Sequence, residues 1–203
     1  MSRIYANRAN IANIANFIML SLSEIKIGEI IKINNEPYAV IKTDHHKMGR
    51  GGAVLKTKLR NLITGNILEK TFQGNEKAEE AETETKKTNF MYKDENQAYF
   101  MDNETYEQFG LSLEQIGEKQ KFLKEGTDVD TLYFSDKPVA IDLPIKMDLK
   151  VVSAPPGVKG NSAGNVNKQV ELETGAKINA PMFVKEGDII KINTDTGEYA
   201  ARA

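Results

Sequence analysis

Short strand-like runs separated by turn signals constrain the fold of this chain most. They begin at Ser23 and recur to the C-terminus, and the turns between them include Asn34-Asn35-Glu36-Pro37, Thr64-Gly65-Asn66 and Thr194-Asp195-Thr196-Gly197. Only residues 111–116 and 120–123 favour a short helix and a turn. The pattern predicts an all-β chain of three small barrels in a row, each of about 60 residues, the first the size of an SH3-like barrel.

The predicted domain boundaries follow these turns and the distribution of charge. Residues 1–22 form an N-terminal extension in which asparagines interrupt the apolar residues, a pattern that disfavours a secretory signal peptide. We expect a poorly ordered tail or an overextended start, with Met19 as the alternative initiator. The three barrels are predicted at residues 23–84, 85–148 and 149–203. Residues 73–87 are predicted to be a polar connection, with an edge strand inside it as the alternative.

A glycine-rich hairpin in the first barrel separates the strand-like runs 37–42 and 53–60. Its centre is Lys47-Met48-Gly49-Arg50-Gly51-Gly52, in which glycines surround one arginine. Glycine bends easily and carries no side chain, so Arg50 is expected at the tip. The predicted loop runs from Thr43 to Gly52 and would project by about 15 Å at roughly 3.3 Å per residue.

Cations continue from this loop onto the strand that follows it. Leu55, Thr57 and Leu59 alternate with three cations, Lys56, Lys58 and Arg60. A period of two places those cations on one face of a strand and the other residues on the opposite face. Two interpretations stay open: a soluble loop beside a charged strand face, or a cationic finger that contacts phosphate.

The charge is distributed unevenly along the chain, whose formal net charge is −2. Residues 24–72 carry nine Lys/Arg against five Asp/Glu, whereas residues 73–148 carry nine against eighteen. Such asymmetry predicts that only part of the surface faces a polyanion. In the last barrel, Tyr199 and Arg202 on one strand are either an edge aromatic with a terminal charge or a contact for single-stranded nucleic acid.

Several classes of function find no support in the sequence. The chain has no cysteine and only two histidines, His45 and His46, so we expect no disulfide, no metal site and no cofactor. It contains no Gly-x-Ser-x-Gly elbow, no His-Glu-x-x-His pair and no phosphate-binding P-loop, and we predict that it is not an enzyme. No apolar run approaches the roughly 20 residues that cross a bilayer. A cytoplasmic monomer is expected.

Motifs in all three barrels resemble the bacterial translation elongation factor P family. The most specific are in the last barrel: Thr174-Gly175, Pro181-Met182-Phe183-Val184, Glu186-Gly187-Asp188 and Thr196-Gly197-Glu198-Tyr199 with Arg202. Ala154 to Gly160, Met101 with Asn103 to Gln108, and Lys47-x-Gly49-x-Gly51 followed by Lys56 to Leu59 also resemble segments of the family. The resemblance covers Ser23 to Ala203.

This resemblance implies one SH3-like (KOW-like) barrel followed by two OB-folds, with a tRNA-like overall shape. It implies binding to the 70S ribosome, both rRNA and ribosomal proteins, between the P and E sites. There the family stimulates peptide-bond formation and relieves stalling at consecutive prolines. The implied partners are P-site peptidyl-tRNA and, through the last barrel, E-site mRNA.

The resemblance also implies roles for particular residues. Arg50 would reach the peptidyl-transferase centre as the tip residue, on a loop formed with Lys47, Gly49, Gly51 and Gly52. The strand cations Lys56, Lys58 and Arg60 would hold tRNA phosphates. The RNA contacts of the last barrel would be Gly160, Asn161, Ser162, Tyr199 and Arg202.

Two departures from the family pattern leave alternatives open. An arginine tip implies rhamnosylation of Arg50, yet the flanking glycines resemble the lysine subtype, so a modified and an unmodified Arg50 are both retained. Gly160-Asn161-Ser162 replaces the usual Gly-Asp-Thr. The alternative functions are a general single-stranded-RNA-binding OB protein and an elongation factor P-like paralogue with a different stalling spectrum.

Overall fold

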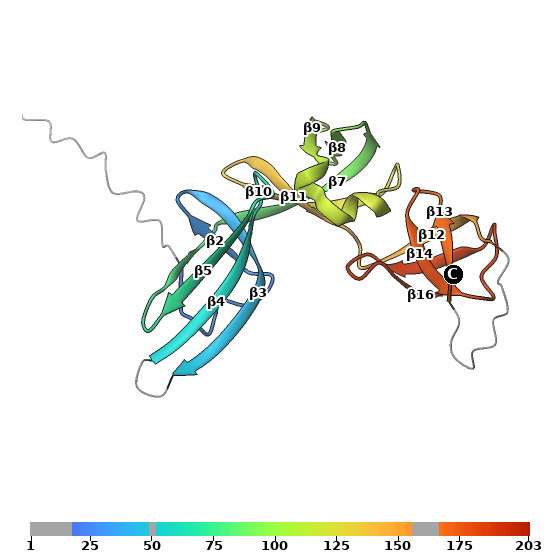
Figure 1. Cartoon of the computed structure of the whole chain (residues 1–203). Helices are drawn as coiled ribbons and strands as arrows, with labels where there is room; N and C mark the ends of the chain where they lie inside the picture. Colours follow the sequence, from blue (N-terminus) through green and yellow to red (C-terminus); the bar gives the residue numbers. More distant parts are fainter. Residues whose placement is uncertain (1–17, 49–51, 156–166) are drawn as a thin grey trace, which may run out of the picture. The chain divides into compact units, whose positions relative to one another are not determined.

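The computed structural model describes residues 18–48, 52–155 and 167–203 (Figure 1). These residues form two compact units. The first ends at Ala81 and excludes Leu62–Asn66, which belong to the second unit together with Glu82–Ala203. The all-β prediction is confirmed, and its short helical segment lies in the second unit.

The first unit is a six-stranded antiparallel sheet in the order β1-β6-β2-β3-β4-β5. Its strands are β1 (Met19–Leu20), β2 (Ile30–Ile33), β3 (Glu36–Met48), β4 (Gly52–Asn61), β5 (Ile67–Gln73) and β6 (Ala78–Glu80). The sheet curls around one apolar core, whose buried members include Ile25, Ile31, Val40, Leu55 and Leu59.

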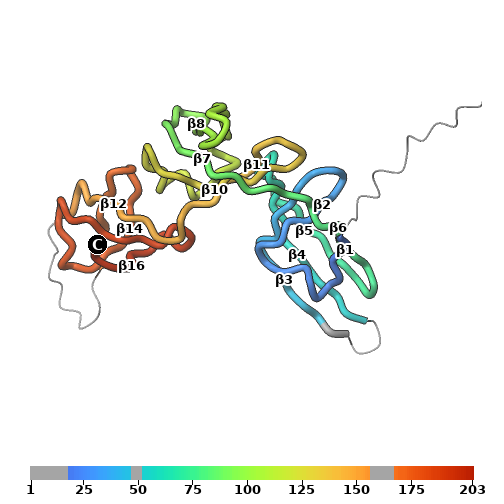
Figure 2. The backbone as a smooth tube through the Cα atoms, turned by 180° about the vertical axis from the view of Figure 1, so that it is seen from behind, coloured from blue at the N-terminus to red at the C-terminus, as the bar shows by residue number. Residues whose placement is uncertain are grey.

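Two predictions for the first unit are corrected. The tail was predicted to extend too far along the chain, because β1 pairs with β6 (Figure 2). Leu20 and Leu22 are also buried in the core. The ten-residue loop from Thr43 is also wrong, since β3 continues to Met48 as a paired strand. The strand expected as an alternative within residues 73–87 is present as β6, although it lies between β1 and β2 and not at the edge of the sheet, and the segment also contains the start of the next strand.

The second unit begins with a five-stranded barrel in the order β11-β10-β7-β8-β9. Its elements are β7 (Thr83–Lys93), β8 (Gln97–Asp102), β9 (Gln108–Ser112), α1 (Leu113–Ile116), the 3-10 helix η1 (Gly117–Phe122), β10 (Asp128–Phe134) and β11 (Lys137–Asp142). Ser112 caps α1 by accepting from the Gln115 amide, and α1 packs beside β9 and β11. The sequence did not predict β9.

The last barrel has the order β14-β13-β12-β15-β16, and β14 lies against β16 to close it. Its strands are β12 (Lys146–Ser153), β13 (Asn167–Leu172), β14 (Lys177–Pro181), β15 (Ile189–Asn193) and β16 (Glu198–Arg202). The boundaries predicted at 84/85 and 148/149 both fall inside strands, β7 and β12, and the structure therefore moves them towards the N-terminus.

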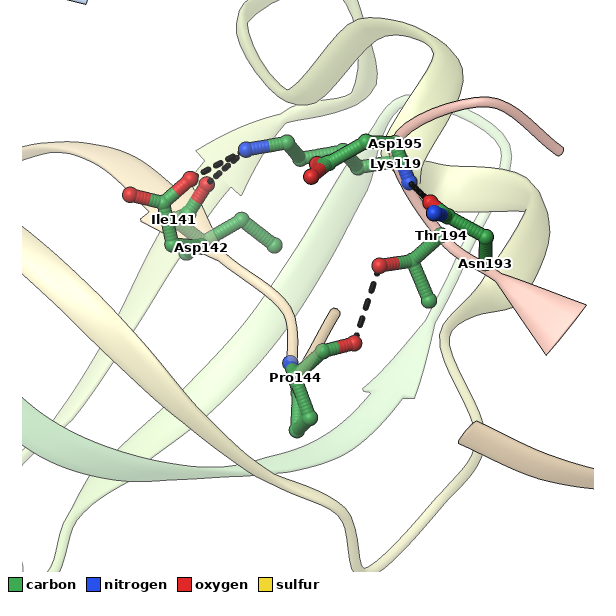
Figure 3. A network of polar contacts seen from close by, with 7 residues as sticks. All are labelled: Lys119, Ile141, Asp142, Pro144, Asn193, Thr194 and Asp195. Carbon is green, nitrogen blue, oxygen red and sulfur yellow. Dashed lines mark hydrogen bonds and ion pairs between the residues drawn. The ribbon is translucent and has the colours of Figure 1, made fainter. Parts of the chain in front are cut away.

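Polar contacts tie the two barrels of the second unit to the segment between them (Figure 3). The Thr194 hydroxyl donates to the Pro144 carbonyl oxygen at 2.9 Å, and its amide donates to Ile145 O at 3.0 Å. Lys119 of η1 donates to the carboxylate of Asp142. One buried apolar cluster, which includes Phe122 and Leu149, is continuous across both barrels.

Candidate nucleic-acid interface

The candidate interface is the outer face of strands β3, β4 and β5 in the first unit. β3 pairs with β4 from Tyr38↔Asn61 to Met48↔Gly52, and Figure 1 shows the two strands side by side. On its other edge β4 is braced by β5 as far as Val54↔Gln73, and the Gly74 amide donates to Ala53 O at 2.9 Å. Almost all of β4 therefore has a hydrogen-bonded strand on both sides.

The inward-facing residues of β4 fix its orientation. Leu55 and Leu59 are fully buried in the core of the unit. Thr57 between them is also buried, and its hydroxyl donates to Lys70 O at 2.8 Å, which satisfies the polar group. A rotation of this strand would expose two leucines, so the alternate side chains are held outward.

The outward-facing residues of β4 are the cations that the sequence predicted. Lys56 and Lys58 are exposed and Arg60 is half-buried, so the predicted period of two is confirmed. A β-bulge at Ile41 shifts the register of β3 and places Lys42 directly opposite Lys58. Lys42 was not among the predicted contacts, because the bulge that brings it to this face leaves no clear sequence signal.

Two carboxylates also lie on this face, which the sequence analysis did not anticipate. Asp44 lies opposite Lys56, and Glu69 of β5 lies opposite Lys58. Lys42 Nζ and Asp44 Oδ2 are 3.5 Å apart, and both side chains are largely exposed, so this pair stabilises the fold little. The residues surround a hollow of about 470 Å³ lined by Lys42, Asp44, Lys56, Thr57, Lys58, Glu69, Lys70 and Thr71.

The charge of this face remains positive after the carboxylates are counted. Within the described part of the chain, Lys56 and Lys58 form no ion pair. Like charges directly opposite each other across two strands destabilise a sheet, and Lys42 and Lys58 are such a pair. Asp44 and Glu69 offset this repulsion only in part, because more lysines than carboxylates line the hollow. The arrangement suits an anionic partner. We call Lys42, Lys56, Lys58 and Arg60 the basic strip.

Gly52 begins β4 with a backbone conformation that favours glycine. Its φ is +81°, in the left-handed region, and it pairs with Met48 across the end of the ladder. The predicted tip residues Gly49, Arg50 and Gly51 lie outside the described residues, as does the side chain of Lys47. The strand ends that lead to them are both described.

The last barrel brings two predicted contacts to one side of β16. A bulge at Ala200 pairs Tyr199 with Ile192 and Arg202 with Ile190. Tyr199 and Arg202 therefore share a face of the strand, although three positions separate them and a regular strand would place them on opposite faces. Tyr199 is half-buried, lies edge-on to Phe183 with ring centroids 6.3 Å apart, and lines a hollow of about 540 Å³ with Lys177. Arg202 donates to Asp188 Oδ1 at 3.0 Å, so its charge is already paired.

The remaining predicted residues of the last barrel, Gly160, Asn161 and Ser162, lie outside the described residues. Lys177 was not among the predicted contacts, because its alternation with Ile178 in a short strand is the only signal that places it on the surface. No helix in the part of the chain that the structure describes is long and apolar enough to cross a membrane.

Three family descriptions match the chain in order. Residues 21–78 match "Elongation factor P (EF-P) KOW-like domain", residues 83–141 match "Elongation factor P (EF-P) OB domain", and residues 147–202 match "Elongation factor P, C-terminal". The three matches cover nearly all of the residues from 21 onward.

Full-length relatives carry the same name. A protein of Endomicrobium trichonymphae called "Elongation factor P" is 43% identical over 185 residues, which cover 91% of this chain and 100% of the relative. One from Carboxydothermus hydrogenoformans is 40% identical over 184 residues, with the same coverage. Among solved structures, a translation initiation factor 5A from Methanococcus jannaschii matches 62% of this chain and 96% of its own, at 19% identity and a TM-score of 0.44.

Proposed function

Because the chain belongs to the elongation factor P family, it is a translation elongation factor, and we propose that it binds the bacterial ribosome beside P-site peptidyl-tRNA. There it stimulates peptide-bond formation and relieves stalling at consecutive prolines. The observation that carries this proposal is the basic strip: four cations on one face of a braced ribbon, with two of its lysines held opposite each other.

The strip supplies the binding part of the mechanism. Its ammonium groups point away from the core and would contact phosphates of the tRNA acceptor arm, releasing counterions. Asp44 and Glu69 on the same face repel phosphate next to Lys56 and Lys58. We infer that they limit binding to RNA whose phosphates match the spacing of the lysines, rather than to any polyanion.

The ribosome performs the chemistry, and the protein supplies orientation. Proline reacts slowly in peptide-bond formation because its ring constrains the attack geometry. Arg50, at the end of the ribbon, would stabilise the CCA end of the tRNA in that geometry, with or without rhamnosylation. Each reduction of about 1.4 kcal/mol in the barrier accelerates the step tenfold, and positioning is able to supply several times that amount.

The last barrel contributes more weakly to this proposal. Tyr199 offers an aromatic face for stacking, whereas Arg202 must leave Asp188 before it contacts RNA. Asn161 and Ser162 are proposed to approach E-site mRNA on the strength of the family resemblance alone.

Translation of a template with consecutive proline codons in a reconstituted system tests the proposal. Arg50→Ala should abolish rescue of the stall while circular dichroism and the thermal midpoint stay those of the wild type. Arg50→Lys, which keeps the charge, should retain part of the activity. Full rescue by Arg50→Ala would reject the role of the tip. Tight binding of naked RNA oligomers without ribosomes would instead favour a general single-stranded-RNA-binding protein.

A further inference from the structure

A second cationic hollow lies in the second unit, far along the chain from the basic strip. It has a volume of about 380 Å³ and is lined by Lys93, Gln120, Lys121, Thr174, Gly175, Ala176 and Lys177. The end of β7, the helix η1 and the turn from β13 to β14 supply these residues. The lining contains three lysines and no carboxylate, although residues 73–148 carry twice as many acids as bases.

The three lysines are not neutralised within the hollow. Lys93 Nζ donates to the backbone carbonyl oxygen of Gln120 at 3.1 Å, which leaves its charge uncompensated. Lys121 pairs with Glu118, which lies outside the lining and is largely exposed. Lys177 forms no ion pair within the described residues, even with Glu171, its partner in the strand register.

Glu173, next to Thr174 in the chain, is a carboxylate that is already bound to other groups. It accepts from Lys124 Nζ at 3.0 Å and from the Lys150 amide at 2.9 Å. A neighbouring hollow of about 480 Å³ contains this pair and shares Lys93 and Thr174 with the first. Lys124, Glu173 and a second carboxylate, Glu125, line this neighbouring hollow, and none of the three lines the lysine-lined hollow.

An unsatisfied hydroxyl lies at the same place. Thr174 Oγ1 is buried and has no hydrogen-bond partner among the described residues, although Thr174 lines both hollows. A buried polar atom without a partner is costly and calls for an explanation. The residue as a whole is only half-buried, and a change to another staggered rotamer would be needed for the hydroxyl to face the hollow.

We propose that this hollow binds a phosphate group, with Lys93, Lys121 and Lys177 as charge-assisted donors and the Thr174 hydroxyl as a neutral donor. Ammonium and hydroxyl groups are the donors that phosphate oxygens take, and no carboxylate in the lining repels the anion. The phosphate belongs either to an RNA backbone or to a small phosphate compound. The inference goes beyond the proposed function, since it uses no residue of the basic strip or of the tip.

Titration of the ligand-free, full-length protein tests the proposal without ribosomes. Inorganic phosphate is added at constant ionic strength against chloride, and the amide resonances of Gly175 and Ala176 are followed by NMR. Saturable shifts at these amides are expected, and they should be absent with chloride. A short oligouridylate that displaces phosphate identifies an RNA backbone as the ligand, and failure to displace it identifies a small phosphate compound. Either result supports the hollow as a phosphate site.

Variants separate a binding role from a structural one. Lys177→Gln, which removes an exposed amine, should weaken phosphate binding about tenfold, as expected for one charge-assisted hydrogen bond. Lys137→Gln, an exposed lysine of the same unit outside the lining, should leave binding unchanged. Thr174→Val should raise the thermal midpoint of the free protein, because it removes the unsatisfied hydroxyl, and should weaken phosphate binding. Absence of saturable shifts, or equal binding by Lys177→Gln and wild type, would overturn the proposal and leave the role of the basic strip untouched.

Discussion

Replacing Gly52 tests how the backbone at the end of the ribbon positions the proposed tip. Gly52 has φ +81°, and a Cβ added there would meet only Gly74 Cα, at 3.8 Å, which is an ordinary van der Waals contact. Gly52→Ala is therefore penalised for its backbone conformation and not for crowding. The stability of this variant therefore reports on backbone conformation in the folded and the unfolded chain, and not on side-chain packing.

The expected magnitude follows from two opposing contributions. The left-handed conformation costs a residue with a Cβ about 1–2 kcal/mol. Alanine also restricts the unfolded chain, which stabilises the folded state by roughly 0.4–1 kcal/mol. The net loss in the free energy of unfolding of the first unit is about 0.8 kcal/mol at the midpoints of the two ranges, and at most about 1.6 kcal/mol. Asn tolerates the left-handed region better, so Gly52→Asn should lose less.

Urea denaturation followed by tyrosine fluorescence of the purified protein measures these differences, and amide hydrogen exchange at Ala53 and Lys47 localises them. Faster exchange at the end of the β3–β4 ladder is expected for the alanine variant. Gly52→Ala should also lower the rescue of proline stalling, since a frayed ladder no longer fixes the direction of the tip. The reasoning would be refuted if Gly52→Ala were as stable as wild type. It would also be refuted if Gly52→Ala and Gly52→Asn were equally stable.

Three further predictions concern the strip, the core and the response to acid. Glu69→Gln removes a carboxylate beside Lys58, so it should strengthen ribosome binding at low salt, by up to about tenfold, in a filter-binding titration. Leu59→Ala leaves a cavity in the core of the first unit and should cost about 2–5 kcal/mol of unfolding free energy in urea. The amides of Thr105 and Glu104 donate to the Asp102 carboxylate and lower its pKa. The ionised carboxylate therefore stabilises the fold fully above its unfolded pKa of about 3.9. This stabilisation is lost as the pH falls through the lower pKa of the folded state. Asp102→Asn should therefore be less stable near neutral pH, and a thermal-midpoint series in acid should show a smaller loss than wild type.

The alternation in β4 could be predicted from the sequence because one of its faces is fully buried. Leu55 and Leu59 mark that face, and the cations between them are then placed outward with no further information. The strands of the two OB barrels other than β9 were predicted for the same reason. Where burial on one face is regular, a period of two is a reliable signal.

The predicted loop from Thr43 failed because that signal disappears at the end of the ribbon. From Asp44 to His46 both faces of β3 are exposed, so no apolar residue marks the strand. The pairing is made by backbone hydrogen bonds with β4 alone. The prediction that the tail extends to residue 22 failed for a different reason. Leu20 and Leu22 are core residues, but their segment contains too few apolar core residues to show a pattern.

The composition of the strip depended on register, which the sequence does not display. The bulge at Ile41 decides that Lys42 faces Lys58, and the pairing of β4 with β5 decides that Glu69 joins them. A second bulge, at Ala200, brings Tyr199 and Arg202 to one side of β16. Each bulge changes which side chains share a face, while the local sequence remains an ordinary strand.

The dependence of ribosome binding on salt tests the central claim most directly. The affinity for ribosomes with peptidyl-tRNA in the P site is measured over a range of salt concentrations for wild type, for Lys56→Gln/Lys58→Gln and for Lys146→Gln as the matched control. If both strip lysines contact phosphate, the slope of log affinity against log salt should be smaller by about 1.4–1.8 in the double variant and unchanged in the control. A double variant with the wild-type slope and affinity would contradict the claim that this face binds RNA.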